Sequence, residues 1–413
     1  MNEQTFIIVG ASVAGSKAAE ELRAAGFDGR VLLIGAESER PYERPPLTKD
    51  YLRGESPREK AYVHEPGFYD QHQIELETDA TVSAIDPAQS RVTLADGRTF
   101  DYDRLLLATG AEPRRIPIVG AELDGVYYLR TLADCDVLRE RLQVGGRVVV
   151  VGGGWIGSEF AASARQRGLE VTVVDPIPLP LEHLFGAEVG AFYRDIHRGH
   201  GVELVLGDGV AAFEGEGRVT RVRTAAGRVI ECDFVVVGIG VAPRVELASG
   251  AGLEIDNGIL VDEKLQTSAP GVFAAGDVAR AFHPFFGERI RVEHWANALN
   301  QGPAAAHAML GEPVSYDRIP YFFSDQYEVG MEYSGHAPKW DEVVFRGEPS
   351  DGEFVAFWLR ERRVVAGMNV NVWDVNEQVQ ALIRSRLPID LDALGDHDTP
   401  LDSLVGEPTT KAD

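Results

Sequence analysis

The chain has 413 residues, of which 44% are hydrophobic and 25% are charged, a composition typical of a globular protein with two or three domains. Its 40 basic and 65 acidic side chains give a formal net charge of −25, which disfavours nucleic acid or an anionic membrane surface as the main partner. Apolar runs such as residues 148–151 and 234–241 are far shorter than the roughly 18 residues that span a bilayer, and no signal peptide is visible. We therefore expect a cytoplasmic protein that binds neither nucleic acid nor membrane.

Two cysteines, Cys135 and Cys232, stand far apart in the chain. This spacing excludes a disulfide framework, a cysteine-rich zinc or iron–sulfur site and a CxxC redox pair. We predict no metal site.

The first predicted element is a strand over residues 6–9, which leads into a glycine turn and an Ala-rich helix. The turn contains Gly10, Ser12 and Gly15. A strand–glycine turn–helix unit directs helix N-terminal N–H groups at a pyrophosphate, and serine is small enough to let a phosphate approach. After the next predicted strand, Glu37 is the expected acceptor for the adenosine ribose hydroxyls.

An internal repeat organises the chain. Residues 5–26 align without gaps on residues 147–168, with identity at seven of 22 positions, and residues 103–114 align on residues 233–244. The repeat predicts two βαβ domains of similar plan, the second beginning near Arg147.

The second copy carries a complete GxGxxG, formed by Gly152, Gly154 and Gly157 after four valines. Its second strand ends at Asp175. A carboxylate there accepts from a ribose 2′-OH and repels a 2′-phosphate, so Asp175 favours NADH over NADPH. The structural alternative is an aspartate that only caps a turn.

A later predicted strand ends at Gly276 and Asp277, where a helix is expected to begin. After two dinucleotide-binding units, this position lets Asp277 bond the ribityl hydroxyls of FAD. We therefore predict tightly but non-covalently held FAD at the first glycine turn and exchanging NADH at the second.

From about Tyr316 the pattern changes to short alternating runs at residues 342–346, 354–359 and 364–370, followed by a helix over residues 375–384. The tail from Leu387 onward is rich in acids, prolines and glycines, and we expect it to be a loosely held extension. The predicted fold class is α/β, with two Rossmann-like dinucleotide-binding domains of the glutathione reductase kind and a C-terminal α+β domain with an antiparallel sheet. The predicted domains are residues 1–110 and 246–315 for FAD, residues 111–245 (core 147–245) for NADH, and residues 316–413.

Several motifs occur in one family's order: residues 44–50 (RPPLTKD), 108–114 (ATGAEPR), the Gly152 turn, Gly276-Asp277, residues 292–295 (VEHW) and 320–326 (PYFFSDQ). By these motifs the chain resembles the NADH-dependent ferredoxin reductases of bacterial cytochrome P450 and Rieske dioxygenase systems, relatives of apoptosis-inducing factor. Disulfide reductases of this superfamily carry cysteines against the flavin, whereas residues 40–53 contain none.

The resemblance implies three catalytic residues. Lys49 corresponds to the lysine near the flavin, and Glu159 to the acid that pairs with this lysine and holds the nicotinamide carboxamide. Phe323 stands where relatives often have a tryptophan that covers the ring edge. In the first copy of the repeat, Lys17 occupies the position that matches Glu159. An acid at this position is therefore a feature of the NADH-binding copy.

The resemblance also completes the binding sets. The expected FAD-binding residues are Gly10, Ser12, Ala14, Gly15, Glu37, Arg44, Lys49, Val82, Ala108, Thr109, Gly110, Arg130, Gly276, Asp277, Glu293, His294 and Trp295. The expected NAD-binding residues are Gly152, Gly154, Ile156, Gly157, Glu159, Asp175 and Gly240.

The resulting hypothesis is an NADH:ferredoxin oxidoreductase, in which FAD accepts hydride and passes single electrons to a [2Fe–2S] or similar ferredoxin that feeds a P450 or Rieske oxygenase. The alternatives are a rubredoxin reductase and an NADH-sensing flavoprotein resembling apoptosis-inducing factor. Because the chain is acidic, docking of an acidic ferredoxin needs a local basic patch. The candidates are Arg289, Arg291, Arg384 and Arg386.

Overall fold

The computed structural model describes residues 4–405, which divide into two compact units. Unit 1 combines residues 1–114 with 241–318, and unit 2 combines residues 115–240 with 319–413. Within residues 4–405, no helix is long and apolar enough to cross a membrane.

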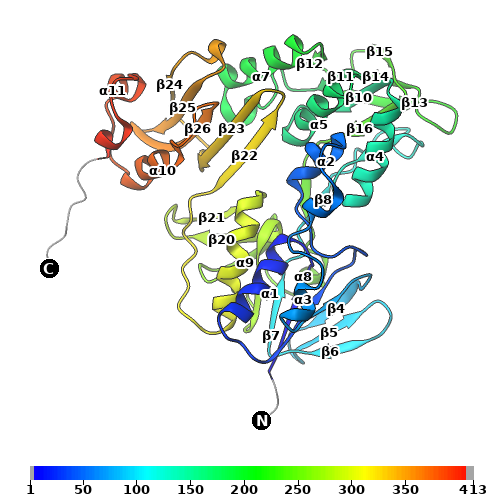
Figure 1. Ribbon diagram of the computed structural model, residues 1–413, viewed down its shortest axis with the longest axis vertical. Coiled ribbons are helices and arrows are strands. Elements are labelled where there is room, and N and C mark those ends of the chain that lie inside the picture. Colours follow the sequence, from blue (N-terminus) through cyan, green and yellow to red (C-terminus); the bar gives the residue numbers. More distant parts are fainter. Residues whose placement is uncertain (1–3, 406–413) are drawn as a thin grey trace. The chain divides into compact units, whose positions relative to one another are not determined.

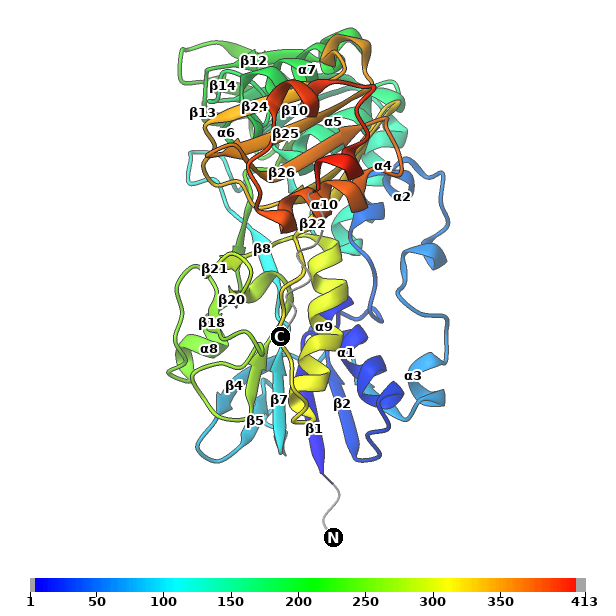
Figure 2. The ribbon, with the colours of Figure 1, turned by 90° about the vertical axis from the view of Figure 1, so that its left-hand side faces the viewer.

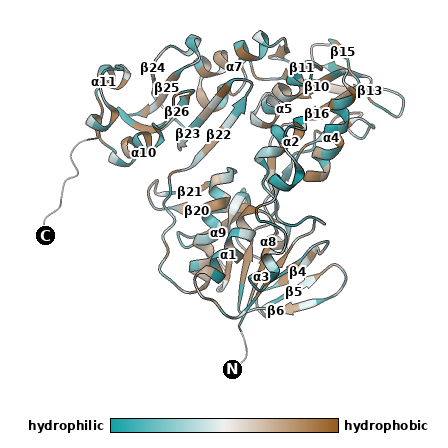
Figure 3. Ribbon diagram, in the orientation of Figure 1, coloured by the Kyte–Doolittle hydropathy of each residue, from teal (hydrophilic) through white to brown (hydrophobic). Residues whose placement is uncertain are grey.

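Unit 1 is built on a five-stranded parallel sheet in the order β19-β7-β1-β2-β3, of which Figure 1 labels β7 and Figure 2 labels β7, β1 and β2. Its strands are short and largely apolar, and they appear mostly brown in Figure 3. Parallel strands covered by helices are buried on both faces, and this explains the near-continuous apolar runs. The strands are β1 (Thr5–Val9), β2 (Arg30–Ile34), β3 (Ile74–Glu77), β7 (Arg104–Leu107) and β19 (Val272–Ala274).

Helices α1 (Val13–Ala24) and α9 (Trp295–Met309) lie side by side in unit 1 (Figures 1 and 2). The two backbones come close at Gly302, where a Cβ would lie 2.4 Å from the carbonyl oxygen of Ala14. Small residues on both helices therefore allow backbone contact.

The remaining elements of unit 1 are short. They are helices α2 (Asp50–Arg53), α3 (Phe68–Gln71) and α8 (Glu246–Gly250), 3₁₀ turns η1 (Pro45–Thr48), η2 (Arg58–Ala61) and η3 (Gly276–Val278), and strands β4 (Val82–Asp86), β5 (Arg91–Leu94), β6 (Thr99–Asp101), β8 (Ala111–Pro113), β17 (Val241–Pro243), β18 (Ile259–Val261), β20 (Ala279–His283) and β21 (Glu288–Arg291).

Unit 2 contains a second five-stranded parallel sheet, in the order β12-β11-β10-β16-β9. The strands β10, β11, β12 and β16 occupy the same relative places as β1, β2, β3 and β7 of unit 1, so the two copies of the repeat have one topology. The strands are β9 (Val126–Tyr128), β10 (Arg147–Val151), β11 (Glu170–Asp175), β12 (Glu203–Leu206) and β16 (Phe234–Val237), with helices α4 (Leu132–Val144), α5 (Trp155–Gln166), α6 (Glu182–Phe185) and α7 (Ala187–Gly199) and the small sheet β13 (Val210–Glu214), β14 (Arg221–Thr224) and β15 (Val229–Glu231).

An antiparallel sheet in the order β22-β23-β26-β25-β24 completes unit 2, and it confirms the predicted C-terminal sheet. The predicted helix over residues 375–384 is also present, as α10. The elements are β22 (Tyr321–Gln326), β23 (Val329–Gly335), β24 (Glu342–Arg346), β25 (Phe354–Arg360), β26 (Arg363–Val370), α10 (Asn376–Ser385), α11 (Leu391–Gly395), η4 (Pro349–Asp351) and η5 (Leu401–Leu404). The four-part domain division drawn from the sequence stays a prediction.

The expectation of a loose tail is wrong for residues 391–404, which form α11 and η5. The buried Arg346 side chain holds this segment, because its Nε donates to the Leu394 carbonyl at 3.0 Å and its Nη2 to the Thr399 carbonyl at 2.9 Å. Composition favoured disorder, whereas one buried cation supplies donors for carbonyls that the short turns leave open. Residues 406–413 of the predicted tail lie outside the described residues.

Two helical glycines allow a matched test of the α1–α9 packing. Gly302→Ala forces a Cβ against the Ala14 carbonyl and should lower the free energy of unfolding by about 1–3 kcal/mol. Gly199→Ala, at the end of α7 with nothing within 4 Å of the new Cβ, should be neutral or stabilising by up to about 1 kcal/mol. Urea unfolding of both variants measures this difference, and equal effects would contradict the packing argument.

Candidate functional site

The first glycine turn joins β1 to α1 by close backbone packing. Gly10 has φ +118°, and a Cβ there would lie 2.1 Å from the carbonyl oxygen of Ala108, at the end of β7. A Cβ at Gly15 would lie 2.0 Å from the Gly10 carbonyl oxygen. Ser12 stands at the N-cap of α1 and makes no side-chain capping bond to the helix. The N-terminus of a twelve-residue helix is thus directed over the carboxyl edge of the sheet, as a pyrophosphate site requires.

The residues expected at the FAD ribose lie together after β2. The Glu37 carboxylate accepts a hydrogen bond from the Tyr42 hydroxyl and lies 3.6 Å from Arg44 Nη2. Tyr42 has no signal in the sequence, because a tyrosine in a proline-rich loop is not distinctive. The arrangement orients Glu37 and leaves carboxylate lone pairs for ribose hydroxyls.

Gly276 and Asp277 follow β19 directly, at the same edge of the sheet as the first turn. A Cβ at Gly276 would lie 3.2 Å from the Ala14 Cβ, and the Gly276 N–H donates to Gln301 Oε1 at 2.9 Å. The structure therefore brings the Ala14 turn and the Gly276–Asp277 pair together. Gln301, on α9, is a contributor that the sequence analysis missed.

Arg291 belongs to this part of unit 1 and not to an exposed patch. Its Nη1 lies 2.5 Å from Glu293 Oε1 and donates to the Asp277 carbonyl at 3.2 Å, and its side chain is 10% exposed. Its proposed role in partner docking is therefore wrong, because the guanidinium is committed to neighbours. Arg289, Arg384 and Arg386 are exposed.

Residues 293–295 lead into α9, with His294 at its N-cap. Burial lowers the pKa of His294 to about 4. Desolvation raises the pKa of Glu43, and the nearby Trp295 side chain partly offsets this shift. Glu43 is a second contributor that the sequence analysis missed. Lys49, the C-cap residue of η1, is largely buried, which is uncommon for a lysine side chain.

The other expected FAD contacts occupy scattered elements. Val82 is buried at the start of β4, and Arg130 precedes α4 in unit 2. Thr109 donates to the Arg244 carbonyl at 2.9 Å, and Gly110 (φ +68°) matches Gly240 (φ +89°) at the ends of the repeated strands.

The second glycine turn repeats the first. A Cβ at Gly152 would lie 2.4 Å from the Gly238 carbonyl oxygen, and a Cβ at Gly157 would lie 2.0 Å from the Gly152 carbonyl oxygen. Gly154 caps α5, and Ile156 lies in its first turn. The N-terminus of α5 is therefore directed as that of α1 is, in the way that a pyrophosphate site requires.

Asp175 ties the end of β11 to this turn. Its Oδ2 accepts from the Gly153 N–H, and its Oδ1 accepts from the Ile177 N–H at 2.8 Å. The carboxylate thus has the turn-capping role weighed as the alternative. An ionised carboxylate has about four acceptor positions, so it can also accept from ribose hydroxyls.

Glu159, on α5, is buried, and its Oε1 accepts a hydrogen bond from the Ser324 hydroxyl of β22 at 2.7 Å. Ser324 was not predicted as a site residue, although it lies within the 320–326 motif. Phe323 lies on the opposite face of β22, because side chains alternate along a strand. The contact between an Ala-rich helix and a distant strand has no sequence signal.

The residues therefore fit two dinucleotides, one at the glycine turn of each unit. A Cβ on the glycines of either turn would fill the space there. Within residues 4–405, no group of three or more His, Cys, Asp or Glu side chains is placed to hold a metal ion. Cys135 and Cys232 are buried in unit 2 and are not joined in a disulfide, and burial raises the pKa of Cys232 to about 12.

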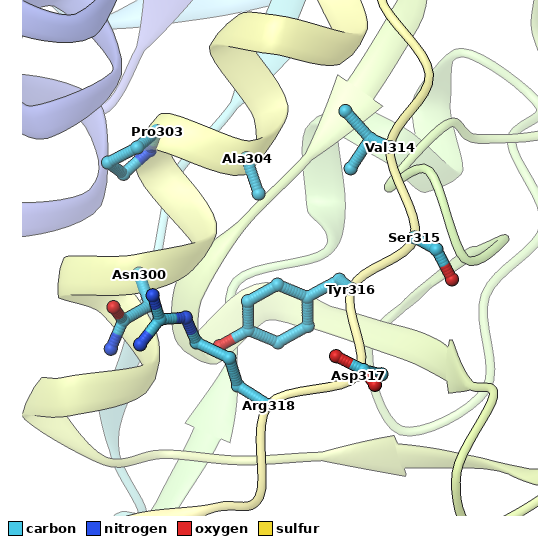
Figure 4. Close-up of a pocket in the computed structure, with 8 residues that line it drawn as sticks. All are labelled: Asn300, Pro303, Ala304, Val314, Ser315, Tyr316, Asp317 and Arg318. Carbon is cyan, nitrogen blue, oxygen red and sulfur yellow. The ribbon is translucent and has the colours of Figure 1, made fainter. Parts of the chain in front are cut away.

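A surface pocket of about 370 Å³ opens between α9 and residues 314–318 (Figure 4). None of its lining residues belongs to the predicted sites. They are Asn300, Pro303, Ala304, Val314, Ser315, Tyr316, Asp317 and Arg318.

Comparison with known proteins matches both parts of the chain. Residues 4–302 match the family described as pyridine nucleotide-disulphide oxidoreductase, and residues 321–405 match the reductase C-terminal family. The chain is 38% identical over 405 residues to putidaredoxin reductase of Pseudomonas putida, covering 97% of this chain and 96% of that protein. It is 41% identical over 379 residues to the anthranilate 1,2-dioxygenase system ferredoxin–NAD(+) reductase component of Burkholderia cepacia, covering 90% and 92%. The crystal structure of the covalent putidaredoxin reductase–putidaredoxin complex matches with a TM-score of 0.94 at 38% identity, covering 98% of each chain.

A buried histidine on α7 gives a pH-dependence of stability. Burial lowers the pKa of His197 to about 4, and its Nε2 lies 3.0 Å from Gln326 Oε1. In the unfolded chain the His197 imidazole takes up a proton near pH 6.5, whereas in the folded chain it does so only near pH 4. The free energy of unfolding therefore has its full value above pH 6.5 and decreases as the pH falls toward 4. The contribution is of the order of 3 kcal/mol.

His197→Gln should flatten urea-unfolding stability between pH 6.5 and pH 4, and His183→Gln, at an exposed position of α6, should leave the slope unchanged. Parallel slopes for wild type and His197→Gln would contradict this assignment.

Proposed function

The chain belongs to the pyridine nucleotide-disulphide oxidoreductase family, and on that premise we propose that it is an FAD-dependent NADH:ferredoxin oxidoreductase. The observation that carries the proposal is the pair of nucleotide cradles in one chain with no cysteine in residues 40–53. Electrons then leave the first site without a thiol relay. The similarity to reductases of P450 and dioxygenase systems supports an iron–sulfur ferredoxin as acceptor and such an oxygenase as the indirect partner.

The residues of unit 1 would hold FAD. Gly10, Gly15 and the α1 N-terminus would receive the pyrophosphate, Glu37 a ribose, and Asp277 the ribityl hydroxyls. Bound FAD would supply the conversion of two-electron hydride input into one-electron output. The roles of Lys49 and Phe323 beside the flavin stay predictions.

The residues of unit 2 would hold NADH. The turn at Gly152–Gly157 would receive the pyrophosphate, Asp175 the adenosine ribose and Glu159 the nicotinamide carboxamide. A cytoplasmic location stays a prediction.

Turnover with the acceptor tests the proposal. The FAD-loaded protein is reduced anaerobically with NADH and then mixed with a [2Fe–2S] ferredoxin, or in parallel with rubredoxin. Rapid reoxidation of the flavin by the ferredoxin is expected. A long-lived NADH complex that neither protein reoxidises would overturn the proposal in favour of an NADH sensor. Faster reoxidation of the flavin by rubredoxin than by the ferredoxin would identify rubredoxin as the acceptor instead.

Asp175 should set the cofactor preference. Asp175→Asn removes the charge and keeps one of the two acceptors that bond the turn, so the NADH-to-NADPH ratio of kcat/KM should narrow by about 10- to 100-fold. Glu170→Gln removes an exposed charge at the start of the same strand and should leave the ratio unchanged. An unaltered ratio in Asp175→Asn, or a wild type that uses both cofactors equally, would contradict the role.

The three remaining candidate arginines should matter only for the protein acceptor. The triple variant Arg289→Glu, Arg384→Glu and Arg386→Glu should slow ferredoxin reduction about tenfold at low salt, because complementary charge raises association rates. NADH-to-ferricyanide turnover should be nearly unchanged, since that small acceptor needs no docking surface. Arg98→Glu, at an exposed arginine outside the set, is the control. Parallel loss of both activities would indicate damage at the flavin instead.

A further inference from the structure

A continuous path of buried hydrogen bonds runs from Glu159 across three elements of unit 2. The Ser324 hydroxyl is 2.7 Å from Glu159 Oε1, and Gln326 Nε2 is 3.3 Å from Ser324 Oγ. Gln326 Oε1 is 3.0 Å from His197 Nε2, and His197 Nδ1 is 3.2 Å from the Tyr327 hydroxyl. Helix α5, strand β22 and helix α7 each contribute to the path.

The path is shielded from solvent at every internal position. Glu159 is 7% exposed, Ser324 2%, Gln326 1% and His197 1%. Aromatic rings hold the three elements together, because Trp155 of α5 packs edge-on against Tyr193 of α7 (ring centroids 5.5 Å apart) and against Phe322 of β22 (5.2 Å). Side chains in such a dry position need fixed partners, since an unpaired polar group is costly there.

The path has one direction while Glu159 is ionised. A carboxylate only accepts, so the single Ser324 proton goes to Glu159 and Ser324 must accept from the Gln326 amide. The Gln326 carbonyl oxygen then faces His197, which donates from Nε2 and accepts at Nδ1 from Tyr327. Because burial lowers the His197 pKa to about 4, the ring is neutral near pH 7, as this direction requires.

We propose that Ser324, Gln326 and His197 form a one-way hydrogen-bond chain that positions the Glu159 carboxylate for the nicotinamide of NADH. The inference rests on the proposed function, which assigns Glu159 to the carboxamide. Ser324 and Gln326 can act together because residues i and i+2 of a strand share a face. None of the three touches the reacting atoms, so they are positioning residues.

The test compares two probes on the FAD-loaded protein. Tetrahydro-NADH carries a nicotinamide ring that cannot donate hydride, and ADP-ribose lacks the ring, so their dissociation constants separate nicotinamide contacts from the rest. Ser324→Ala should weaken tetrahydro-NADH binding about 10- to 100-fold, the usual size of one lost hydrogen bond to a charged group. ADP-ribose binding should stay within about twofold, because Glu159 does not contact that part.

Conservative variants sharpen the test. Ser324→Thr keeps the hydroxyl and should restore binding, and His197→Gln keeps a donor toward Gln326 and should bind more tightly than His197→Leu. Ser334→Ala is the matched control, because Ser334 is buried on the neighbouring strand β23 and bonds Asn376 at 2.6 Å. It should lose comparable stability and leave both dissociation constants unchanged.

The variant Glu159→Gln separates the two hypotheses. A selective loss of tetrahydro-NADH binding in Glu159→Gln without one in Ser324→Ala overturns the positioning chain and leaves the role of Glu159 intact. No selective loss in Glu159→Gln overturns the assigned role of Glu159 and the chain with it. Equal weakening of both probes in Ser324→Ala also overturns the chain, because it indicates general damage.

Discussion

Backbone contact at two glycine turns is the constraint on which both candidate sites depend. At Gly10 and Gly152 a Cβ would lie 2.1 and 2.4 Å from a carbonyl oxygen at the end of the adjacent strand, and both residues have positive φ. At Gly15 and Gly157 it would lie 2.0 Å from the carbonyl oxygen of the first glycine. Each helix therefore starts directly above the sheet edge, which is where its N-terminal N–H groups can meet a pyrophosphate. Any side chain at these positions would push the helix away.

The residues around each glycine turn give the two copies of the repeat different functions. In unit 1, β19 places Gly276 and Asp277 beside Ala14 of α1. In unit 2, β22 of the antiparallel sheet brings Ser324 to Glu159 on α5. The first copy has Lys17 at the matching position, 2.7 Å from Glu20, and so presents no acid there. The same supersecondary unit is thus specialised by a strand from elsewhere in the chain.

The sequence predicted the features that depend on local spacing. The repeat, the parallel sheets, both glycine turns and the C-terminal sheet follow from glycine positions and from apolar runs of strand length, and the structure has each of them. Contacts between distant segments had no such signal. Gln301 at Gly276 and Ser324 at Glu159 are ordinary residues until the fold brings them together. The same reason explains the ordered segment after residue 390, which one buried arginine holds.

The division of labour between the two turns is the central claim, and flavin content together with NADH reduction of the variant Gly157→Ala tests it most directly. The added Cβ meets the Gly152 carbonyl in unit 2 and leaves unit 1 unaltered. The account predicts a variant that keeps one FAD per chain and is reduced by dithionite as the wild type is, but whose flavin NADH no longer reduces at saturating rates. The account would be contradicted if the variant lost FAD while NADH still reduced its remaining flavin as in the wild type.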